Sequence, residues 1–274
     1  MFKVIANQPL TAGLHRLVLE APRIAKARRP GQFVIVRRAE GAERVPLTIA
    51  DADESAGTIT LIIQAIGAST RALVATPAGG ALRDVAGPLG RATRLERWGT
   101  VACIGGGVGT AVLYPMAKAL ADSGNQVHAV IGARSAGLVI LAKELAAFAA
   151  QVHVVTEDGS LGHKGLVTAV LADMLAGKLP RPDAVFAVGP VRMMAAVADL
   201  TRPAAIPTIV SLNPIMIDGT GMCGGCRVTV GGKILFACVD GPEVDAHQVD
   251  FRELSARQAT YREADCRLLT EIPK

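Results

Sequence analysis

The stretch Val101–Thr110, VACIGGGVGT, combines an apolar strand pattern, a glycine-rich loop and the start of a helical pattern. Glycines allow close approach of the backbone to a ligand, and a helix N-terminus directs free N–H groups toward an anion. The stretch therefore predicts a pyrophosphate cradle of the dinucleotide-binding type. The match to G-x-G-x-x-G is imperfect, because a threonine stands where the third glycine would be. The residues expected to form the cradle are Gly105, Gly106, Gly107, Val108, Gly109 and Thr110.

Strand and helix patterns alternate on both sides of this loop, from about residue 98 to residue 211. Candidate strands cover 99–104, 126–131, 151–156, 184–188 and 206–211. Helical patterns lie between them at 109–122, 138–150, 164–176 and 190–200. Such alternation predicts a parallel five-stranded sheet with helices on both faces. We assign residues 98–212 to this NAD(P)-binding α/β domain.

The residues that follow the second and third strands bear on the choice of nucleotide. An acidic residue closing the second strand would select the ribose 2′-OH of NAD. That strand instead ends in Arg134, which could meet a 2′-phosphate, whereas Glu157 and Asp158 after the third strand could equally hold a ribose. The sequence leaves NADH versus NADPH open.

Residues 2–95 consist mostly of short β-rich runs separated by Gly, Pro and Asp clusters, which is typical of an antiparallel barrel or sandwich. We assign residues 1–97 to this domain. The run Arg44–Thr48, RVPLT, places a cation, a rigid proline and a hydroxyl on one strand. The run Gly67–Thr70, GAST, places hydroxyls at an expected helix start, a second anion site. Both local patterns also occur in ordinary strands and helix caps.

The stretch from Asp218 to Cys238 holds three of the five cysteines, spaced D-x4-C-x2-C-x11-C. A plant-type [2Fe–2S] site uses C-x4-C-x2-C with a distant fourth cysteine. We therefore interpret residues 213–274 as a segment that binds a [2Fe–2S] cluster, with one carboxylate among the ligands. The expected ligands are Asp218, Cys223, Cys226 and Cys238.

The spacing of the cysteines alone leaves alternatives to a [2Fe–2S] cluster open. Zinc could use the three cysteines with Asp218 or His247. The C-x2-C pair could also be a redox dithiol or coincidental. Cys266 competes with Asp218 for the remaining ligand position, although it lies far downstream.

Composition narrows the class of protein. The chain has 274 residues, of which 50% are hydrophobic and 19% charged, enough for one large domain or two to three small ones. Aromatic residues are only 3% and the net charge of +5 is scattered, so nucleic-acid binding is not expected. The cysteines form no disulfide framework and no signal peptide is visible, so we expect a cytoplasmic protein. The uncharged run Trp98–Met116 contains five glycines and Pro115, and we expect no membrane span.

The runs Arg44–Thr48 and Gly105–Thr110, with Gly189 and Pro190 after the fourth strand, resemble the ferredoxin–NADP⁺ reductase superfamily. The resemblance implies an FAD-binding antiparallel barrel that precedes the nucleotide-binding domain. Gly189 and Pro190 match a C-G-P turn beside the nicotinamide, but the cysteine is missing. The family pattern implies that Arg44 contacts the FAD pyrophosphate and that Thr48 lies near the flavin ring as the catalytic contact. The other FAD contacts it implies are Pro46, Leu47, Gly67, Ser69 and Thr70.

The motifs LNPIMIDGTGMCGGCRVTV and ACVDGPEVDAHQVDF extend the resemblance over the whole chain. They are similar to the small FAD/[2Fe–2S] subunits of NADH-dependent ferredoxin–NADP⁺ oxidoreductases and sulfide dehydrogenases, which carry aspartate at the first ligand position. Electron-transfer subunits of dihydroorotate dehydrogenase, with four cysteines, are cousins.

This resemblance implies a subunit that moves electrons between NAD(P)H, FAD and a [2Fe–2S] cluster and on to a partner. The implied partner is a larger flavoprotein subunit that resembles the glutamate synthase small subunit and carries [4Fe–4S] clusters. Ferredoxin is a further candidate partner, and the complex could bifurcate electrons. Two alternatives are an electron-transfer subunit of a dihydroorotate dehydrogenase and a non-catalytic nucleotide-binding module with structural zinc.

Overall fold

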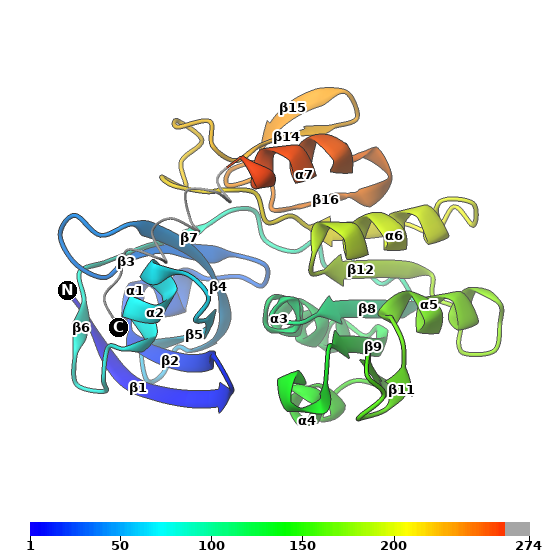
Figure 1. Cartoon of the computed structure of the whole chain (residues 1–274), viewed down its shortest axis with the longest axis horizontal. Coiled ribbons are helices and arrows are strands. Elements are labelled where there is room, and N and C mark those ends of the chain that lie inside the picture. The colour runs from blue at the N-terminus through cyan, green and yellow to red at the C-terminus, as the bar shows by residue number, and fades with distance from the viewer. Residues whose placement is uncertain (261–274) are drawn as a thin grey trace.

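The N-terminal β-rich runs form a curled antiparallel sheet, a half-barrel (Figure 1). The computed structural model describes residues 1–260, and in it the strand order of this sheet is β6-β1-β2-β5-β4-β3-β7. Two short helices, α1 (Pro22–Ala27) and α2 (Ala68–Val74), accompany it. The strands are β1 (Phe2–Thr11), β2 (Leu14–Glu20), β3 (Phe33–Arg37), β4 (Arg44–Asp53), β5 (Thr58–Gln64), β6 (Ala81–Leu82) and β7 (Asp84–Leu89).

Strand β4 presents two different faces, because successive side chains of a strand point to opposite sides. Val45 and Leu47 pack against the buried core of the half-barrel. Arg44, Pro46 and Thr48 therefore lie on its outer face. Of the R-x-P-L-T run, only these outer side chains can reach a ligand outside the barrel, and Leu47 can contribute only its backbone.

The second sheet contains the five parallel strands that the sequence predicts, and two further strands extend it. Its order is β11-β10-β9-β8-β12-β13-β16. The parallel strands β8, β9, β10, β12 and β13 form its centre, β11 adds one parallel edge, and β16 pairs antiparallel with β13. The strands are β8 (Thr100–Gly106), β9 (Gln126–Ala133), β10 (Gln151–Thr156), β11 (His163–Lys164), β12 (Ala184–Val188), β13 (Thr208–Ser211) and β16 (Glu243–Asp245).

Helices α3 (Gly109–Asp122), α5 (Val167–Leu175) and α6 (Val191–Thr201) lie where the helical patterns predict them. The helix expected over 138–150 is wrong in extent, since a 3₁₀ turn (Ala136–Leu138) precedes a short α4 (Ala142–Ala146). Leu141, between them, has a φ of 58°. Ile140 and Leu141 are buried with Leu14 and Ala50 of the half-barrel. This contact between the two sheets overrides the local helical pattern.

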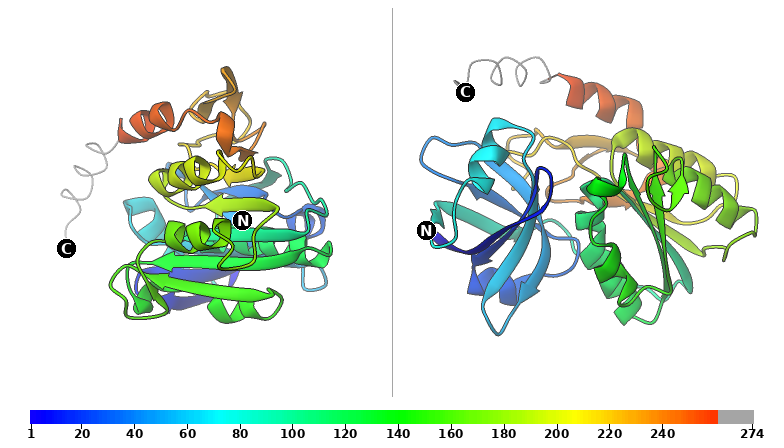
Figure 2. Two further views of the ribbon diagram at one scale, coloured as in Figure 1. Left: turned by 90° about the vertical axis from the view of Figure 1, so that its right-hand side faces the viewer. Right: turned by 60° about the horizontal axis from the view of Figure 1, so that its bottom comes forward.

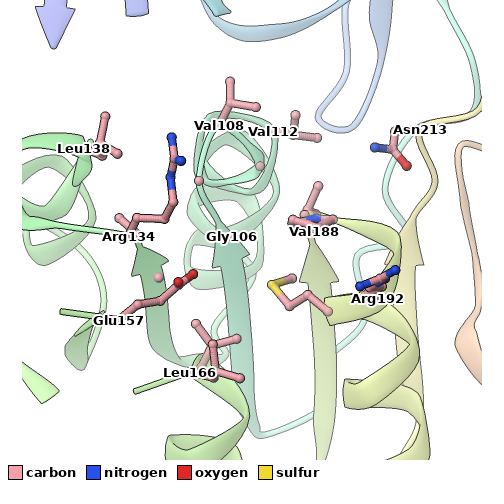
Figure 3. Close-up of a pocket in the computed structure, with 18 of the residues that line it drawn as sticks. Gly106, Val108, Val112, Arg134, Leu138, Glu157, Leu166, Val188, Arg192 and Asn213 are labelled. Carbon is pink, nitrogen blue, oxygen red and sulfur yellow. The ribbon is translucent and has the colours of Figure 1, made fainter. Parts of the chain in front are cut away.

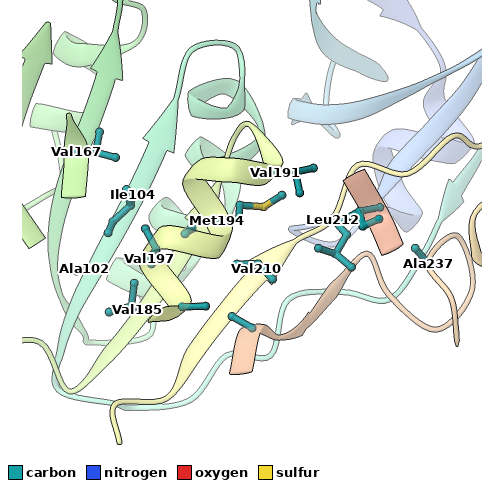
Figure 4. Packing of buried hydrophobic residues seen from close by; sticks show 14 of the residues in the cluster. Ala102, Ile104, Val167, Val185, Val191, Met194, Val197, Val210, Leu212 and Ala237 are labelled. Carbon is teal, nitrogen blue, oxygen red and sulfur yellow. The ribbon is translucent and has the colours of Figure 1, made fainter. Parts of the chain in front are cut away.

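The C-terminal segment adds a hairpin of β14 (Arg227–Val230) and β15 (Lys233–Phe236), a 3₁₀ turn (Ala246–Gln248) and helix α7 (Phe251–Ala259). It lies beside α6, and the right-hand view of Figure 2 shows it extending toward the half-barrel. Ala237 joins the same buried cluster as Val185 and Val210 of the second sheet and Met194 of α6 (Figure 4). The segment therefore shares a core with that sheet. Cys266 lies outside the described residues.

No described helix has the length and apolar character needed to span a membrane.

Candidate functional site

A large cavity, about 790 Å³, opens at the carboxyl ends of the parallel strands (Figure 3). Residues following β8, β9, β10, β12 and β13 line it, and Leu14, Gln64 and Ile66 of the half-barrel close one side. Ligands of open α/β sheets bind outside the carboxyl ends of the strands. The cavity is therefore where a dinucleotide would be expected, in contact with both sheets.

The glycine loop lies at the centre of this cavity, and its glycines have distinct roles. Gly107 has a φ of +57°, a left-handed conformation that favours glycine, and faces open space. A Cβ on Gly106 would lie 2.5 Å from the sulfur of Met193, and a Cβ on Gly109 would overlap the carbonyl oxygen of Val188. Gly109 therefore supplies the close helix–strand packing expected of the third glycine. Thr110 is buried beneath the loop, which explains why the motif tolerates it.

The structure separates the three charged residues considered for the ribose. Arg134 and Glu157 both line the cavity, where Figure 3 shows their side chains. The Asp158 carboxylate instead accepts hydrogen bonds from the hydroxyl and backbone N–H of Ser160, at 2.6 and 2.9 Å. These bonds, led by the hydroxyl, lower the pKa of Asp158. Asp158 thus closes a local turn, and Glu157 is the acidic side chain that faces the cavity.

Gly189 and Pro190 line the cavity as the sequence predicts, and α6 begins directly after them. Polar residues at the cavity that the sequence did not single out include Gln64, Arg192 and Asn213. The last two follow the carboxyl ends of β12 and β13, and that position was the signal that could have found them. Asn213 also lies within the LNPIMIDGTGMCGGCRVTV motif without having been given a role.

The barrel residues expected to hold FAD come together at the start of β4. The hydroxyl of Ser69 donates a hydrogen bond to Glu43, which directly precedes Arg44. The Thr70 hydroxyl accepts a hydrogen bond from the N–H of Gly67 at 3.0 Å and so closes the first turn of α2. The two runs that are distant in sequence therefore adjoin, as one phosphate site would require.

A second cavity, of about 360 Å³, lies on the outer face of the half-barrel. Arg44 and Asp218 both line it, beside an ion pair of Arg37 with Asp84. Arg44 itself forms no ion pair with any residue in the range 1–260. Its guanidinium is thus available to an anionic ligand, and it lies close to the cysteine-rich loop.

The four expected cluster ligands form two pairs. Asp218 accepts hydrogen bonds from the N–H groups of Thr220 and Cys223, at 2.9 and 2.8 Å, and the sulfur atoms of Cys226 and Cys238 lie 3.1 Å apart. The bond from Thr220, with that from Cys223, holds the pKa of Asp218 below its usual range. Burial, with a hydrogen bond to Cys226, raises the pKa of Cys238 to about 12. Two pairs of potential ligands suit a centre of two iron atoms, and metal binding would remove the thiol protons.

The candidate zinc ligands include His247, which is engaged elsewhere. Within residues 1–260, no three His, Cys, Asp or Glu side chains lie close enough together to hold one metal ion, the expected cluster ligands included. The Nε2 atom of His247 lies 2.9 Å from the hydroxyl of Thr201, to which it is hydrogen-bonded. Cys103 is a buried residue of β8, and burial raises the pKa of its thiol.

The cysteine-rich loop packs directly on the half-barrel. A Cβ on Gly219 would lie 2.6 Å from Leu89 of β7 and 3.0 Å from Ile35 of β3. Ile35 pairs with Pro46 across β3 and β4. The loop therefore lies against the outer face that carries Arg44, Pro46 and Thr48, within a few residues of the expected flavin site.

Comparison with known proteins agrees with this arrangement. Residues 213–250 match the iron–sulfur cluster binding domain of dihydroorotate dehydrogenase B. A dihydroorotate dehydrogenase B (NAD(+)) electron transfer subunit homolog of Thermotoga maritima is 44% identical over 233 residues, which cover 85% of this chain and 82% of the relative. The electron transfer subunit of dihydroorotate dehydrogenase B (NAD(+)) from Bacillus caldolyticus is 35% identical over 255 residues, covering 89% and 96%.

A solved structure described as the NADH-dependent reduced ferredoxin-NADP oxidoreductase, reported for its flavin-based electron bifurcation, has the same fold. It is 40% identical to this chain, with a TM-score of 0.92, and the match covers 98% of this chain and 97% of that chain.

The half-barrel, the glycine-loop sheet and the iron–sulfur domain define an oxidoreductase-type electron transfer subunit of the flavin and iron–sulfur class. The chain belongs to the family of dihydroorotate dehydrogenase B electron transfer subunits, with a fold like that of ferredoxin–NADP⁺ reductase. This confirms the resemblance, the fold class and the electron-transfer role. It also confirms, for the family, the expected FAD, iron–sulfur cluster and NAD(P)H, and it favours the cluster over zinc.

Proposed function

We propose that this subunit takes electrons from NAD(P)H and delivers them singly, through FAD and a [2Fe–2S] cluster, to a larger partner subunit. When bound, the flavin links hydride transfer to the one-electron chemistry of an iron–sulfur centre. The chemistry allows the reverse flow equally. The observation that carries the proposal is the packing of the loop at Gly219 on β3 and β7, because it holds the cluster motif against the outer face of the half-barrel.

FAD, the [2Fe–2S] cluster and the nucleotide each have suitable residues in this chain. The outer face of β4 offers Thr48 to the flavin ring and Arg44 to the pyrophosphate, with the α2 start at Ser69 beside it. Proposed cluster ligands are Asp218, Cys223, Cys226 and Cys238. Proposed nucleotide contacts are the loop Gly105–Thr110, Arg134, Glu157, Gly189 and Pro190. Asp158 is not among them, because its carboxylate is held by Ser160.

The proposed partner is a larger flavoprotein subunit. Two relatives are electron transfer subunits, and the solved relative is described as an NADH-dependent ferredoxin-NADP oxidoreductase. The carboxylate at position 218 stands where the family resemblance implies a fourth cysteine in dihydroorotate dehydrogenase subunits. It therefore favours a partner of the glutamate-synthase-like type over a dihydroorotate oxidase. We propose a heterodimer with such a flavoprotein, with ferredoxin as a further redox partner.

Three units carry these roles in our proposal: residues 1–97 for FAD, 98–212 for NAD(P)H and 213–274 for the cluster. The described cysteines, Cys103, Cys223, Cys226 and Cys238, are all free thiols. Free thiols of this kind suit a reducing compartment such as the cytoplasm.

Anaerobic reduction of the purified protein tests the proposal. NADH or NADPH is expected to bleach the flavin absorbance and to produce the low-temperature paramagnetic signal of a reduced [2Fe–2S] cluster. In Cys226→Ser the flavin should still bleach while the cluster signal is lost, because one ligand of the buried pair is removed. Cys103→Ala, a buried thiol of β8, should keep both signals and serves as the matched control.

Flavin bleaching without any cluster signal in the wild-type protein, even with dithionite, would overturn the proposed relay. Absence of bleaching by either nucleotide would overturn its nucleotide dependence.

A further inference from the structure

Asn213 is one of the polar side chains at the large cavity that have no role in the site described so far. Asn213 follows β13 and lines the cavity (Figure 3). Its side chain is tied to helix α7, since Gln258 Nε2 lies 2.7 Å from the backbone oxygen of Asn213 and 3.1 Å from its Oδ1. These two contacts decide which way the asparagine amide is turned.

The orientation follows from what each group can donate or accept. A backbone carbonyl only accepts hydrogen bonds, so the atom of Gln258 that faces it must be the NH₂ group. The same NH₂ group faces the side chain of Asn213, so the atom presented to it must be the oxygen Oδ1. The amide nitrogen Nδ2 of Asn213 is thereby turned the other way, and Figure 3 shows it on the side of Val112, another lining residue. No acceptor for Nδ2 occurs among residues 1–260.

The position of Asn213 along the cavity indicates which part of a dinucleotide it would meet. The glycine loop, which suits the pyrophosphate, lies centrally, with Arg134 and Glu157 toward β9 and β10. Asn213 lies at the opposite end, after β13, and five residues further on Asp218 lines the cavity on the half-barrel. The reacting half of a nicotinamide dinucleotide must lie toward the flavin, so the nicotinamide falls at the Asn213 end and the adenosine at the Arg134 end.

We propose that Asn213 Nδ2 donates a hydrogen bond to the carboxamide oxygen of the nicotinamide, and that Gln258 is the positioning residue that keeps it turned toward the cavity. The inference rests on the proposed use of NAD(P)H and names the contact that fixes the nicotinamide half. An adenosine diphosphate ribose lacks this carboxamide. The contact therefore distinguishes the complete dinucleotide from its adenosine half.

Helix α7, which holds Asn213 through Gln258, is also hydrogen-bonded to the cysteine-rich loop. Arg257, next to Gln258, donates a hydrogen bond from Nη2 to the backbone oxygen of Gly225 at 3.3 Å. Gly225 lies between the cysteines of the C-x2-C pair. Neighbouring residues of one helix thus hold the nicotinamide end of the cavity and the cysteine-rich loop.

Binding to the oxidised protein with its cofactors bound tests the inference. NAD⁺ or NADP⁺, whichever the wild type binds, is compared by calorimetric titration with ADP-ribose or 2′-phospho-ADP-ribose. Asn213→Ala should weaken dinucleotide binding about three- to tenfold, the range for one neutral hydrogen bond, and leave the ribose fragment unchanged. Gln258→Leu should give a smaller loss with the same discrimination. Ser255→Ala, on the exposed side of α7, should bind both ligands like the wild type.

Two results would overturn the inference while leaving the proposed function intact. In one, Asn213→Ala binds the dinucleotide as tightly as the wild type. In the other, it weakens both ligands equally or loses FAD, which would make Asn213 a structural or flavin-site residue. A wild-type protein that neither binds nor oxidises either nucleotide would instead refute the proposed function itself.

Discussion

Two backbone hydrogen bonds fix the side chain of Asp218 beside the first cysteine of the C-x2-C pair. Its carboxylate accepts two backbone N–H groups, from Thr220 and Cys223, so it is held in place as an anion next to a thiol. A carboxylate is a harder ligand than a thiolate, and ligand type affects the reduction potential of a cluster. Asp218 therefore has the fixed geometry of a ligand, although loop closure alone would also use these bonds.

Substitution at Asp218 separates these two roles. Asp218→Cys is expected to retain the [2Fe–2S] cluster with a shifted reduction potential, because a thiolate replaces the carboxylate. Asp218→Ala is expected to lose most of its iron, because no ligand remains at the first position. Iron and sulfide content, with the paramagnetic signal of the reduced protein, measures both. Loss of the cluster in Asp218→Cys together with wild-type iron in Asp218→Ala would show that the carboxylate only closes the loop.

At the scale of elements, the packing of helix α3 on strand β12 depends on Gly109. A Cβ there would overlap the carbonyl oxygen of Val188, and backbone atoms cannot rotate away as side chains can. Gly109→Ala should therefore push the start of α3 away from the sheet, lowering stability by about 1–3 kcal/mol and weakening dinucleotide binding. Thermal unfolding and nucleotide titration measure the two effects.

Gly137→Ala is the matched control for this substitution. A Cβ on Gly137 would meet no atom within 4 Å, so both properties should stay at wild-type values. Equal behaviour of the two variants would contradict the assignment of a packing role to Gly109.

Local sequence patterns predict most, but not all, of the helices and strands of the second sheet. Strand–helix alternation predicts β8, β9, β10, β12 and β13, and the helices α3, α5 and α6, because their periodicity is strong and local. It fails over 138–150, where Ile140 and Leu141 are buried against the half-barrel, a contact that no local pattern contains. It also cannot predict β16, whose pairing with β13 joins residues far apart in sequence.

The candidate site divides in the same way. The glycine loop and the D-x4-C-x2-C-x11-C spacing could be found because their chemistry depends on spacing within one stretch. Gln64 could not, because it reaches the cavity only when the half-barrel closes one side of it. Arg192 and Asn213 carried only the general signal of a position after a parallel strand. Glu157 and Asp158 look alike in sequence, and only the turn that Asp158 makes with Ser160 separates them.

At the scale of the whole molecule, Glu243 lies where the half-barrel, the connection between β7 and β8, and the C-terminal segment meet. Its carboxyl accepts a hydrogen bond from the Thr93 hydroxyl at 2.6 Å, and a Cβ on Gly31 would contact it. Within the described chain it forms no ion pair. Burial raises the pKa of Glu243 to about 7, against the partial opposing effect of the Thr93 hydrogen bond.

Two buried histidines make the stability of the fold depend on pH in the acidic range. His128 and His153 stack with ring centroids 6.4 Å apart on β9 and β10, and neither ring nitrogen of His128 has a partner among the described residues. Burial lowers the pKa of both, with a further contribution from His128 to the lowering at His153. The folded state therefore disfavours their protonation, and stability falls as the pH drops below about 6.5, their ordinary pKa.

For Glu243 the sign is reversed, because a raised carboxyl pKa means that the folded state binds the proton more tightly than the unfolded chain. Its contribution to stability is complete below about pH 4.5 and is lost as the pH rises to about 7. Glu243→Gln should therefore match the wild type at pH 5 and exceed it at pH 8, by up to about 3 kcal/mol. Apparent melting temperatures of the cofactor-bound protein across this range measure the difference, with the exposed Glu54→Gln as control. A constant offset between Glu243→Gln and the wild type at every pH would show that the carboxyl does not titrate on unfolding.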